Sequence, residues 1–214
     1  MTDALAVNSY TGTKSNSKEI SPVDIAKEVF RSTVMVLAGT DSSASQGSGF
    51  VVGKGLIATN YHVVKDADVI CVNQIGDSKN LRKASLYAVD SKSDLAILFC
   101  PELKLPIIRV GDGVKVAVGE NIYAVGNPKG FEGTFSNGIV SGIRIENGKR
   151  RLQITAPISR GSSGGPLLDR TGSVIGVTSY YYAGGQNLNF AVPIENVKIM
   201  LRDPMRFKPL SKFQ

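Results

Sequence analysis

The sequence predicts an all-β domain whose antiparallel strands form a sandwich or barrels. Short runs rich in Val and Ile recur about every 10–12 residues, which is the strand spacing of such folds. Turn residues, including 23 glycines, separate these runs, and glycine supplies the backbone conformations that tight turns require. Every apolar run is far shorter than the ~20 residues that span a bilayer, so no transmembrane helix is expected.

The first predicted element is a short helix that begins after Ser21. Serine is a good N-cap, Pro22 suits the first helical position, and Asp24 complements the positive end of the helix dipole. The elements that follow are predicted strands at 33–38, 49–52, 56–59, 69–73, 85–89, 95–99, 107–110, 121–125, 138–145, 152–156, 166–168, 174–181 and 189–192. A short closing helix is predicted over 194–201.

Length and composition indicate one soluble globular domain. The chain has 214 residues, of which 42% are hydrophobic and 20% charged, so a disordered chain, a coiled coil and a collagen-like polymer are excluded. Residues 1–20 show no periodicity and are predicted to be a flexible tail. The domain is expected over 21–201, followed by a second tail at 202–214. Because residues 1–20 lack the basic and apolar segments of a secretory signal, a cytoplasmic location is expected.

The net charge of +7 is spread along the chain. Its densest cluster, Lys149, Arg150 and Arg151, follows Asn147 and Gly148, a pair typical of tight hairpin turns. We interpret these charges as the solvated shoulder of a hairpin and expect no nucleic-acid partner. A structural or nucleic-acid-binding barrel is an alternative that would rest on the net charge alone.

The two cysteines, Cys71 and Cys100, are too few for a disulfide framework. They are expected to be buried free thiols that behave as small hydrophobic side chains. No Cys/His cluster has the spacing of metal ligands, so neither a metal nor another cofactor is expected.

The most informative stretch is 161–166, which reads Gly-Ser-Ser-Gly-Gly-Pro. A serine between glycines can be presented on a tight turn, with neighbouring backbone N–H groups directed toward one point. Nucleophilic acyl transfer needs this arrangement, because the hydroxyl must be exposed beside donors for the developing oxyanion. By itself, however, a Ser/Gly turn is more often only a turn.

Two further residues could activate such a serine. His62 is the chain's one histidine, and imidazole has the right pKa to accept a hydroxyl proton. Asp94 opens the apolar strand at 95–99, where a half-buried carboxylate needs a partner, and an imidazole N–H is a natural one. Alone, His62 could be an ordinary core or surface residue and Asp94 an ordinary turn residue. Their occurrence with Ser163, in the order His, Asp, Ser, favours a catalytic triad.

Ordered motifs extend over most of the chain, from about residue 25 to residue 201. They are Gly-Ser-Gly-Phe at 47–50, Thr-Asn-Tyr-His-Val-Val at 59–64, Asp-Leu-Ala-Ile-Leu at 94–98, Ala-Val-Gly-Asn-Pro at 124–128, Gly-Ile-Val-Ser at 138–141, Gly-Ser-Ser-Gly-Gly-Pro-Leu at 161–167 and Asn-Phe-Ala-Val-Pro at 189–193. Together they resemble the trypsin-like (chymotrypsin-fold) serine proteases, and among these the protease domain of the HtrA (Deg) group. The resemblance implies two six-stranded antiparallel β-barrels, roughly 33–110 and 115–193, with the active site in the cleft between them.

The resemblance also implies roles for individual residues. Ser163 would be the nucleophile, His62 the general base and Asp94 the acid that orients the base. Gly161 and Ser163 would supply the N–H groups of the oxyanion hole, and Ser179 would bond to the Asp94 carboxylate.

A specificity pocket is implied in the same way. Pro157 and Ile158 would form its floor, Leu188 its wall, and Ser179 and Tyr180 the adjoining edge that binds substrate. Without a carboxylate there, burying a Lys or Arg side chain would be costly, so small to medium aliphatic residues are expected before the cleaved bond. Alternatively, Ile158 and Leu188 merely fill the core of the second barrel.

The predicted function is that of an HtrA-like serine endopeptidase that hydrolyses protein or peptide substrates. The alternative is a catalytically weak protease-fold module that binds peptides. The sequence departs from the HtrA pattern at Ser162, where the group usually has asparagine, and it shows no PDZ domain. The resemblance further implies a homo-oligomer, commonly a trimer, and no membrane segment is expected.

Overall fold

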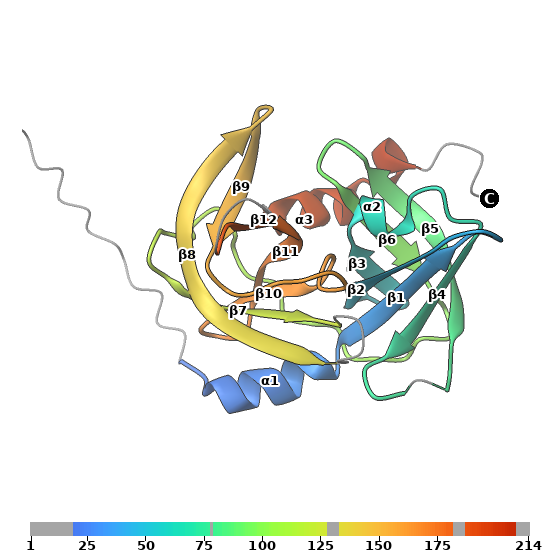
Figure 1. The fold of residues 1–214 in the computed structure, drawn as a ribbon, viewed down its shortest axis with the longest axis horizontal. Helices are drawn as coiled ribbons and strands as arrows, with labels where there is room; N and C mark the ends of the chain where they lie inside the picture. Colours follow the sequence, from blue (N-terminus) through green and yellow to red (C-terminus); the bar gives the residue numbers. More distant parts are fainter. Residues whose placement is uncertain (1–18, 78, 128–132, 182–186, 209–214) are drawn as a thin grey trace, which may run out of the picture.

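The structure is a computed structural model that describes residues 19–77, 79–127, 133–181 and 187–208. Its strands form two closed antiparallel barrels of six strands each, which lie side by side (Figure 1). The two-barrel fold that the resemblance implied is therefore confirmed. The tail predicted at residues 1–20 falls almost entirely outside the described residues.

The first barrel has the strand order β1-β2-β3-β6-β5-β4 and closes where β4 pairs with β1. Its strands are β1 (Thr33–Gly39), β2 (Ala44–Gly53), β3 (Leu56–Thr59), β4 (Val69–Gln74), β5 (Arg82–Asp90) and β6 (Leu95–Phe99). Successive side chains of a strand point to opposite faces. Val34 and Val36 of β1 therefore point inward together and are fully buried with Leu98 of β6.

The second barrel has the strand order β10-β11-β12-β9-β8-β7. Its strands are β7 (Asn121–Gly126), β8 (Thr134–Glu146), β9 (Lys149–Ile154), β10 (Pro166–Asp169), β11 (Val174–Tyr181) and β12 (Asn189–Pro193). Leu152 and Ile154 of β9 alternate inward in the same way and pack with Ile122 of β7.

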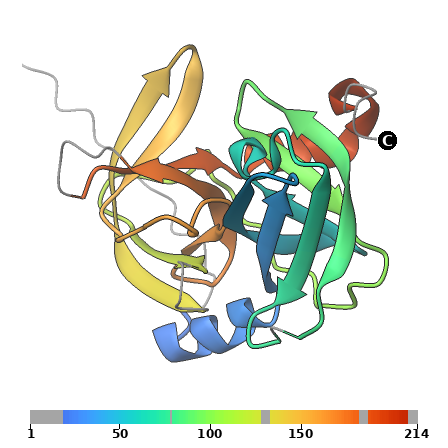
Figure 2. The ribbon, with the colours of Figure 1, turned by 45° about the vertical axis from the view of Figure 1, so that its right-hand side comes forward.

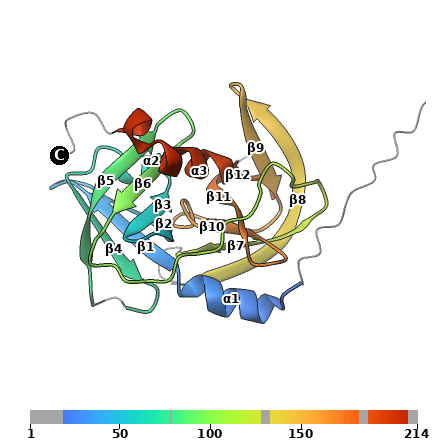
Figure 3. The same ribbon diagram turned by 180° about the vertical axis from the view of Figure 1, so that it is seen from behind.

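A third cluster of buried side chains joins the two barrels. It contains Phe50 and Leu95 of the first barrel, Val177 and Val192 of the second, and Met200 of the helix α3 (Glu195–Arg202). Figure 3 shows this helix lying across the back of both barrels. Burying each large apolar side chain stabilises the fold by about 1.5–3 kcal/mol, so this cluster fixes the position of one barrel relative to the other.

The first helix confirms the capping signals of the sequence. In α1 (Pro22–Phe30), the hydroxyl of Ser21 accepts a hydrogen bond from the backbone N–H of Asp24 at 3.1 Å. Two short elements were not predicted: the one-turn helix α2 (Tyr61–Val64) and the 3₁₀ helix η1 (Pro204–Phe207), which lies where a tail was predicted. No helix among the described residues is long and apolar enough to cross a membrane.

The strand predicted at 107–110 is absent from both barrels. This segment crosses from one barrel to the other and forms only an isolated bridge between Val110 and Val174. Both ladders are already closed without it. Ile108 is nevertheless buried and donates its N–H to the carbonyl of Val51 at 3.0 Å. The apolar pattern therefore reflects a buried connection rather than a strand.

The β8–β9 hairpin extends beyond the body of its barrel (Figure 2). Asn147 and Gly148 both have positive φ, 50° and 73°, as the predicted tight turn requires. The interpretation of the following charges as a solvated shoulder is wrong. Lys149 donates to the hydroxyl of Ser93 at 2.7 Å, Arg150 to the carbonyls of Val114 and Val116 at 3.2 and 3.4 Å, and Arg151 is only 8% exposed. Neighbouring segments supply hydrogen-bond acceptors for Lys149 and for one nitrogen of Arg150, and Arg151 is buried with its Nε atom 3.9 Å from Oε2 of Glu146.

Both cysteines are free thiols, as predicted. Cys100 is buried, and this burial raises the pKa of its thiol. Cys71 is only partly buried. The two thiols therefore contribute packing rather than cross-links.

Candidate active site

His62 lies on α2, the single helical turn that follows β3. Its side chain is 47% exposed, which leaves the imidazole accessible from solvent. Asp94 occupies the turn between β5 and β6, immediately before β6, and its side chain is 25% exposed. The Nδ1 atom of His62 lies 2.8 Å from Oδ2 of Asp94. The structure thus brings these two predicted residues into direct contact.

The Asp94 carboxylate accepts hydrogen bonds at both oxygens. Oδ1 accepts the backbone N–H of His62 at 2.9 Å, while Oδ2 also accepts the hydroxyl of Ser179 at 2.8 Å. An ionised carboxylate can only accept, so Nδ1 of His62 carries the proton in this contact. When the ring is neutral, this arrangement leaves a lone pair on Nε2 that can accept a proton.

The backbone of Asp94 has a left-handed conformation, with φ of 62°. Aspartate tolerates this region better than most residues, yet the conformation still costs about 1–3 kcal/mol. Two hydrogen bonds to the Asp94 carbonyl hold it in place, one from the Asn60 side chain at 2.8 Å and one from the backbone N–H of Tyr61 at 3.2 Å. Both donors lie beside His62 in the sequence, so the turn and the helix α2 are fixed as one unit.

Ser163 lies in the glycine-rich turn before β10, between Gly161 with φ of 98° and Gly164 with φ of 88°. The Ser163 hydroxyl donates to the carbonyl oxygen of Ser179 at 2.8 Å. Within the described part of the chain, no hydrogen bond joins this hydroxyl to His62. The structure therefore connects Ser163 to the other two residues through Ser179 rather than by direct contact.

Ser179 of β11 makes this connection with two different groups. Its side chain donates to Asp94, and its backbone carbonyl accepts from Ser163. Ser179 therefore lies against Asp94, and its carbonyl also fixes the resting position of the Ser163 hydroxyl.

The backbone N–H groups around Ser163 differ in whether they have a hydrogen-bond acceptor. The N–H of Ser162 donates to the carbonyl of Ser159 at 2.9 Å. By contrast, the N–H groups of Gly161 and Ser163 have no acceptor among the residues that the structure describes. These are the two donors predicted for the oxyanion hole.

Ser48 is a residue of this site to which the sequence reasoning gave no role. It is fully buried, and its hydroxyl donates to the carbonyl of Gly161 at 2.7 Å while accepting the N–H of Asn127 at 2.8 Å. Its own N–H donates to the carbonyl of Ser163 at 2.8 Å. Ser48 thereby holds the serine turn of the second barrel against β2 of the first. The available signal was its place in the Gly-Ser-Gly-Phe motif at 47–50.

Replacing Gly164 by Ala is expected to lower the free energy of unfolding by about 3–5 kcal/mol, since it adds steric overlap to left-handed strain. A Cβ atom there would overlap the backbone oxygen of Ser48 and the hydroxyl of Thr59. Urea unfolding monitored by circular dichroism measures the loss. The matched control is Gly119→Ala, where φ is 94° and no atom lies within 4 Å of the added Cβ; its cost should be only about 1–2 kcal/mol. Equal losses in the two variants would show that the overlap is not important.

The residues predicted to form a specificity pocket have different environments. Pro157 is exposed, whereas Ile158 and Leu188 are partly buried. Ile158 packs against the core cluster of the second barrel, as the core-filling alternative requires. The carbonyl of Pro157 accepts the hydroxyl of Ser136 at 2.8 Å. Leu188 lies beside Asn189, whose side chain donates to the carbonyl of Ala156 at 2.8 Å.

Tyr180 follows Ser179 on β11 and is linked to the β8–β9 hairpin. Its ring stacks on Phe190 with centroids 4.9 Å apart, and its hydroxyl donates to Glu146 at 2.5 Å. Burial and the neighbouring carboxylate raise the pKa of Tyr180 to about 12. The phenol therefore stays protonated at neutral pH and keeps its hydrogen bond to the hairpin.

The described residues contain no group of three or more His, Cys, Asp or Glu side chains that could hold a metal ion. The Asp94 carboxylate is instead occupied by His62 and Ser179. The arrangement is suited to hydrogen bonding and proton transfer at a serine hydroxyl.

A double β-barrel with a His–Asp pair beside a glycine-flanked serine defines the class of chymotrypsin-like serine hydrolases. Residues 47–177 match the family model described as the trypsin-like peptidase domain. The chain belongs to this family.

Within the family, the domain is of the HtrA type. It is 41% identical over 165 residues to a "Probable periplasmic serine endoprotease DegP-like" from Hahella chejuensis, covering 73% of this chain and 35% of that relative. A solved serine endoprotease from Yersinia pestis superposes with a TM-score of 0.77 and 27% identity, covering 88% of this chain and 68% of that one. The solved structure "HtrA-type protease AlgW with tripeptide" superposes with a TM-score of 0.78 and 28% identity, covering 86% of this chain and 63% of that one. The resemblance stated from the motifs is confirmed.

The chain spans about a third of the length of the curated relatives that it matches. These relatives are named as probable periplasmic endoproteases. This finding contradicts the cytoplasmic location expected above. The expectation depended on finding no secretory signal in residues 1–20, and a homologous domain found in periplasmic proteins outweighs that argument.

Proposed function

We propose that the chain is a serine endopeptidase in which Ser163 is the nucleophile, His62 the general base and Asp94 the orienting acid. The observation that supports this assignment best is the continuous hydrogen-bonded path from His62 through Asp94 and Ser179 to Ser163. These residues come from both barrels. A serine that served only to form a turn would not need a hydrogen-bonded path to a histidine and a carboxylate.

The proposed reaction begins when a substrate carbonyl carbon approaches Ser163. The hydroxyl leaves the Ser179 carbonyl and turns toward Nε2 of His62, which takes its proton as the Oγ–C bond forms. Catalytic hydrogen bonds are often absent or long without substrate and form in the complex, so the resting contact with Ser179 fits this step. Asp94 keeps the proton on Nδ1 and stabilises the imidazolium that results.

The electron pair of the carbonyl moves to its oxygen, which becomes an oxyanion. In our proposal the free N–H groups of Gly161 and Ser163 donate to it. Such donors typically contribute 10²–10³-fold each to turnover. Collapse breaks the C–N bond, and the leaving amine takes the proton from His62. A water molecule then attacks the acyl carbon and loses a proton to His62. As the Oγ–C bond breaks, His62 returns this proton to Oγ of Ser163, and the acyl group leaves as a carboxylic acid.

The function is tested by cleavage of a peptide library with the wild-type chain and with Ser163→Ala. We expect products only from the wild type, together with covalent labelling of Ser163 by a phosphonylating reagent. The alternative, a peptide-binding module without turnover, predicts bound peptides but neither products nor labelling in the wild type. A finding of that kind would overturn the peptidase assignment.

We further propose that small to medium aliphatic residues precede the cleaved bond. The support is the apolar character of Ile158 and Leu188, which bring no charge to pair with Lys or Arg. The backbone of Ser179 and Tyr180 would bind the main chain of the substrate beside Ser163.

Leu188→Gly should widen this preference to Phe and Met, because removal of the side chain deepens the pocket. Discrimination by one methylene is worth about 1–3 kcal/mol, so kcat/KM for Phe relative to Val should rise at least about tenfold. Library cleavage with product sequencing measures this ratio. The control Leu188→Met keeps the volume and should keep the preference. Cleavage mainly after Lys or Arg, or an unchanged preference in Leu188→Gly, would contradict the assignment.

By relation to the DegP-like proteins, we propose a periplasmic location and protein substrates for the complete protein. We also carry forward the homo-oligomer implied by the resemblance. Cell fractionation tests the first proposal, and analytical ultracentrifugation of the chain tests the last; a monomer at high micromolar concentration would contradict it.

A further inference from the structure

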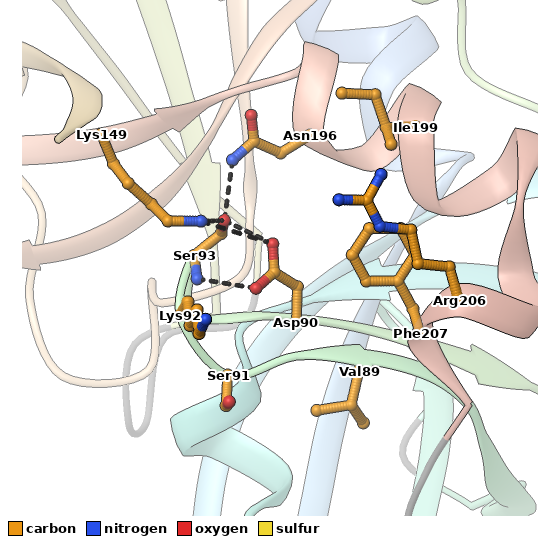
Figure 4. Close-up of a pocket in the computed structure, with 10 residues that line it drawn as sticks. All are labelled: Val89, Asp90, Ser91, Lys92, Ser93, Lys149, Asn196, Ile199, Arg206 and Phe207. Atoms are coloured by element: carbon orange, nitrogen blue, oxygen red, sulfur yellow. Dashed lines mark hydrogen bonds and ion pairs between the residues drawn. The ribbon is translucent and has the colours of Figure 1, made fainter.

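A pocket of about 430 Å³ lies beside the turn that carries Asp94 (Figure 4). The end of β5 and residues 91–93 form one side of it, and the start of β9, the helix α3 and η1 form the other. The volume is within the range of small-molecule sites. None of its lining residues belongs to the triad, and the proposed reaction does not use it.

The charged side chains of this pocket are mainly basic. The lining contains three cations, Lys92, Lys149 and Arg206, and one carboxylate, Asp90. Both oxygens of Asp90 are already occupied, because Ser93 donates its N–H to Oδ1 at 3.0 Å and its hydroxyl to Oδ2 at 2.5 Å. Lys149 lies 3.8 Å from Oδ2 as well. Lys92 and Arg206 have no acidic partner within the residues that the structure describes, so the pocket has an excess of positive charge.

The lining also has an apolar part. Val89, Ile199 and Phe207 contribute hydrocarbon surface, and Ile199 is 45% exposed. The guanidinium of Arg206 lies 5.6 Å from the centre of the Phe207 ring. Figure 4 shows Arg206 and Phe207 together at one side of the pocket and Lys149 at the other. A ligand that fits this lining has an anionic group for the cations and an apolar body for the ring.

We propose that this pocket binds a small organic anion, a phosphate or a carboxylate on an apolar body, and that its occupancy lowers the activity of the neighbouring site. The binding half of the proposal is independent of the peptidase assignment. The regulatory half rests on that proposed function.

The hydroxyl of Ser93 connects the pocket to the active site. It is buried and accepts hydrogen bonds from Lys149 at 2.7 Å and from the Asn196 side chain at 2.9 Å, while donating to Asp90. One hydroxyl thus joins the β5–β6 turn to β9 and α3, and the next residue in the chain is Asp94. An anion in the pocket competes with Ser93 for Lys149, which loosens the turn that positions Asp94 against the imidazole.

Binding is measured by isothermal titration calorimetry on the full chain carrying Ser163→Ala, so that turnover plays no part. The probes are phenyl phosphate, benzoate, inorganic phosphate and uncharged benzyl alcohol. We expect saturable binding of phenyl phosphate or benzoate, with the tighter one identifying the anionic group, and much weaker binding of the two remaining probes. Absence of saturable binding by both organic anions, or equal binding of benzyl alcohol, would overturn the site.

Two charge-matched variants locate the binding. Lys92→Gln with Arg206→Gln should weaken it at least tenfold. Lys54→Gln with Lys104→Gln removes the same charge away from the pocket and should change it less than twofold. Equal weakening in the two double variants would mean that only the net charge attracts the anion, and the pocket would be rejected.

The regulatory half is measured as peptide cleavage by the active chain. At saturating phenyl phosphate, kcat should fall several-fold with little change in KM, and the Lys92/Arg206 double variant should lose the response. An unchanged or raised kcat would overturn the inhibitory role. A chain that binds the anion but cleaves nothing without it would contradict the peptidase assignment and leave the binding site standing.

Discussion

Replacing Ser163 by Ala is expected to reduce turnover about 10⁶-fold, the loss typical when the serine or the histidine of such a triad is removed. The alanine leaves no hydroxyl to attack the substrate, while the other groups stay in place. His62→Ala should cost a similar factor, because without a base the hydroxyl remains a weak nucleophile. The double variant should be little worse than either single one, since both residues act in one proton transfer in the proposed mechanism.

The neighbouring serine provides the matched control. Ser162 is also in the turn, but among the described residues its hydroxyl bonds only to the N–H of Ser159, which it accepts at 3.3 Å. Ser162→Ala should therefore retain turnover within about tenfold of the wild type. Burst kinetics with an active-site titrant measure the fraction of competent sites in all variants. Appreciable turnover in Ser163→Ala, or a greater loss in Ser162→Ala, would identify the wrong nucleophile.

Asp94→Asn is expected to reduce kcat about 10⁴-fold while the fold is retained. The backbone N–H of His62 is a fixed donor to Oδ1, so the amide oxygen of Asn takes that position. The amide NH₂ then replaces Oδ2 and faces Nδ1 of the imidazole. It can only donate, which forces the proton of the ring onto Nε2. A ring protonated at Nε2 has no lone pair there for the serine proton.

Asparagine adopts the left-handed conformation of this turn as readily as aspartate does, so the loss should be chemical rather than structural. Asp66→Asn tests this point, because Asp66 has a φ of 60° and is exposed. The free energy of unfolding of both variants should be within about 1 kcal/mol of the wild-type value, but only Asp94→Asn should lose turnover. Near wild-type turnover in Asp94→Asn would exclude it as the orienting acid.

Local sequence signals predicted the parts of the site that depend on a few adjacent residues. The glycines around Ser163 indicated a tight turn, and the apolar strand after Asp94 indicated a half-buried carboxylate. The predicted contact of that carboxylate with His62 is present at 2.8 Å. Each of these features follows from backbone freedom or from the cost of burying a charge, which can be judged from neighbouring residues.

The features that were missed depend on contacts between distant segments. The bond from Ser48 to Gly161 joins residues 113 positions apart, and no periodicity encodes it. Arg150 and Arg151 seemed solvated because their packing partners could not be identified from the sequence. The apolar segment at 107–110 was taken for a strand because its pattern cannot distinguish a barrel strand from a buried connection.

The division of the site between the barrels has a mechanical consequence. In the proposed enzyme, the first barrel contributes His62 and Asp94, the second contributes Ser163 and Ser179, and Ser48 clamps one half to the other. A displacement of about 1 Å at reacting atoms can cost 10²-fold in rate. A small rotation of one barrel against the other would therefore abolish cleavage although every strand stays intact. The rate of cleavage therefore reports the relative position of the two barrels, and it does so more sensitively than any spectrum of secondary structure.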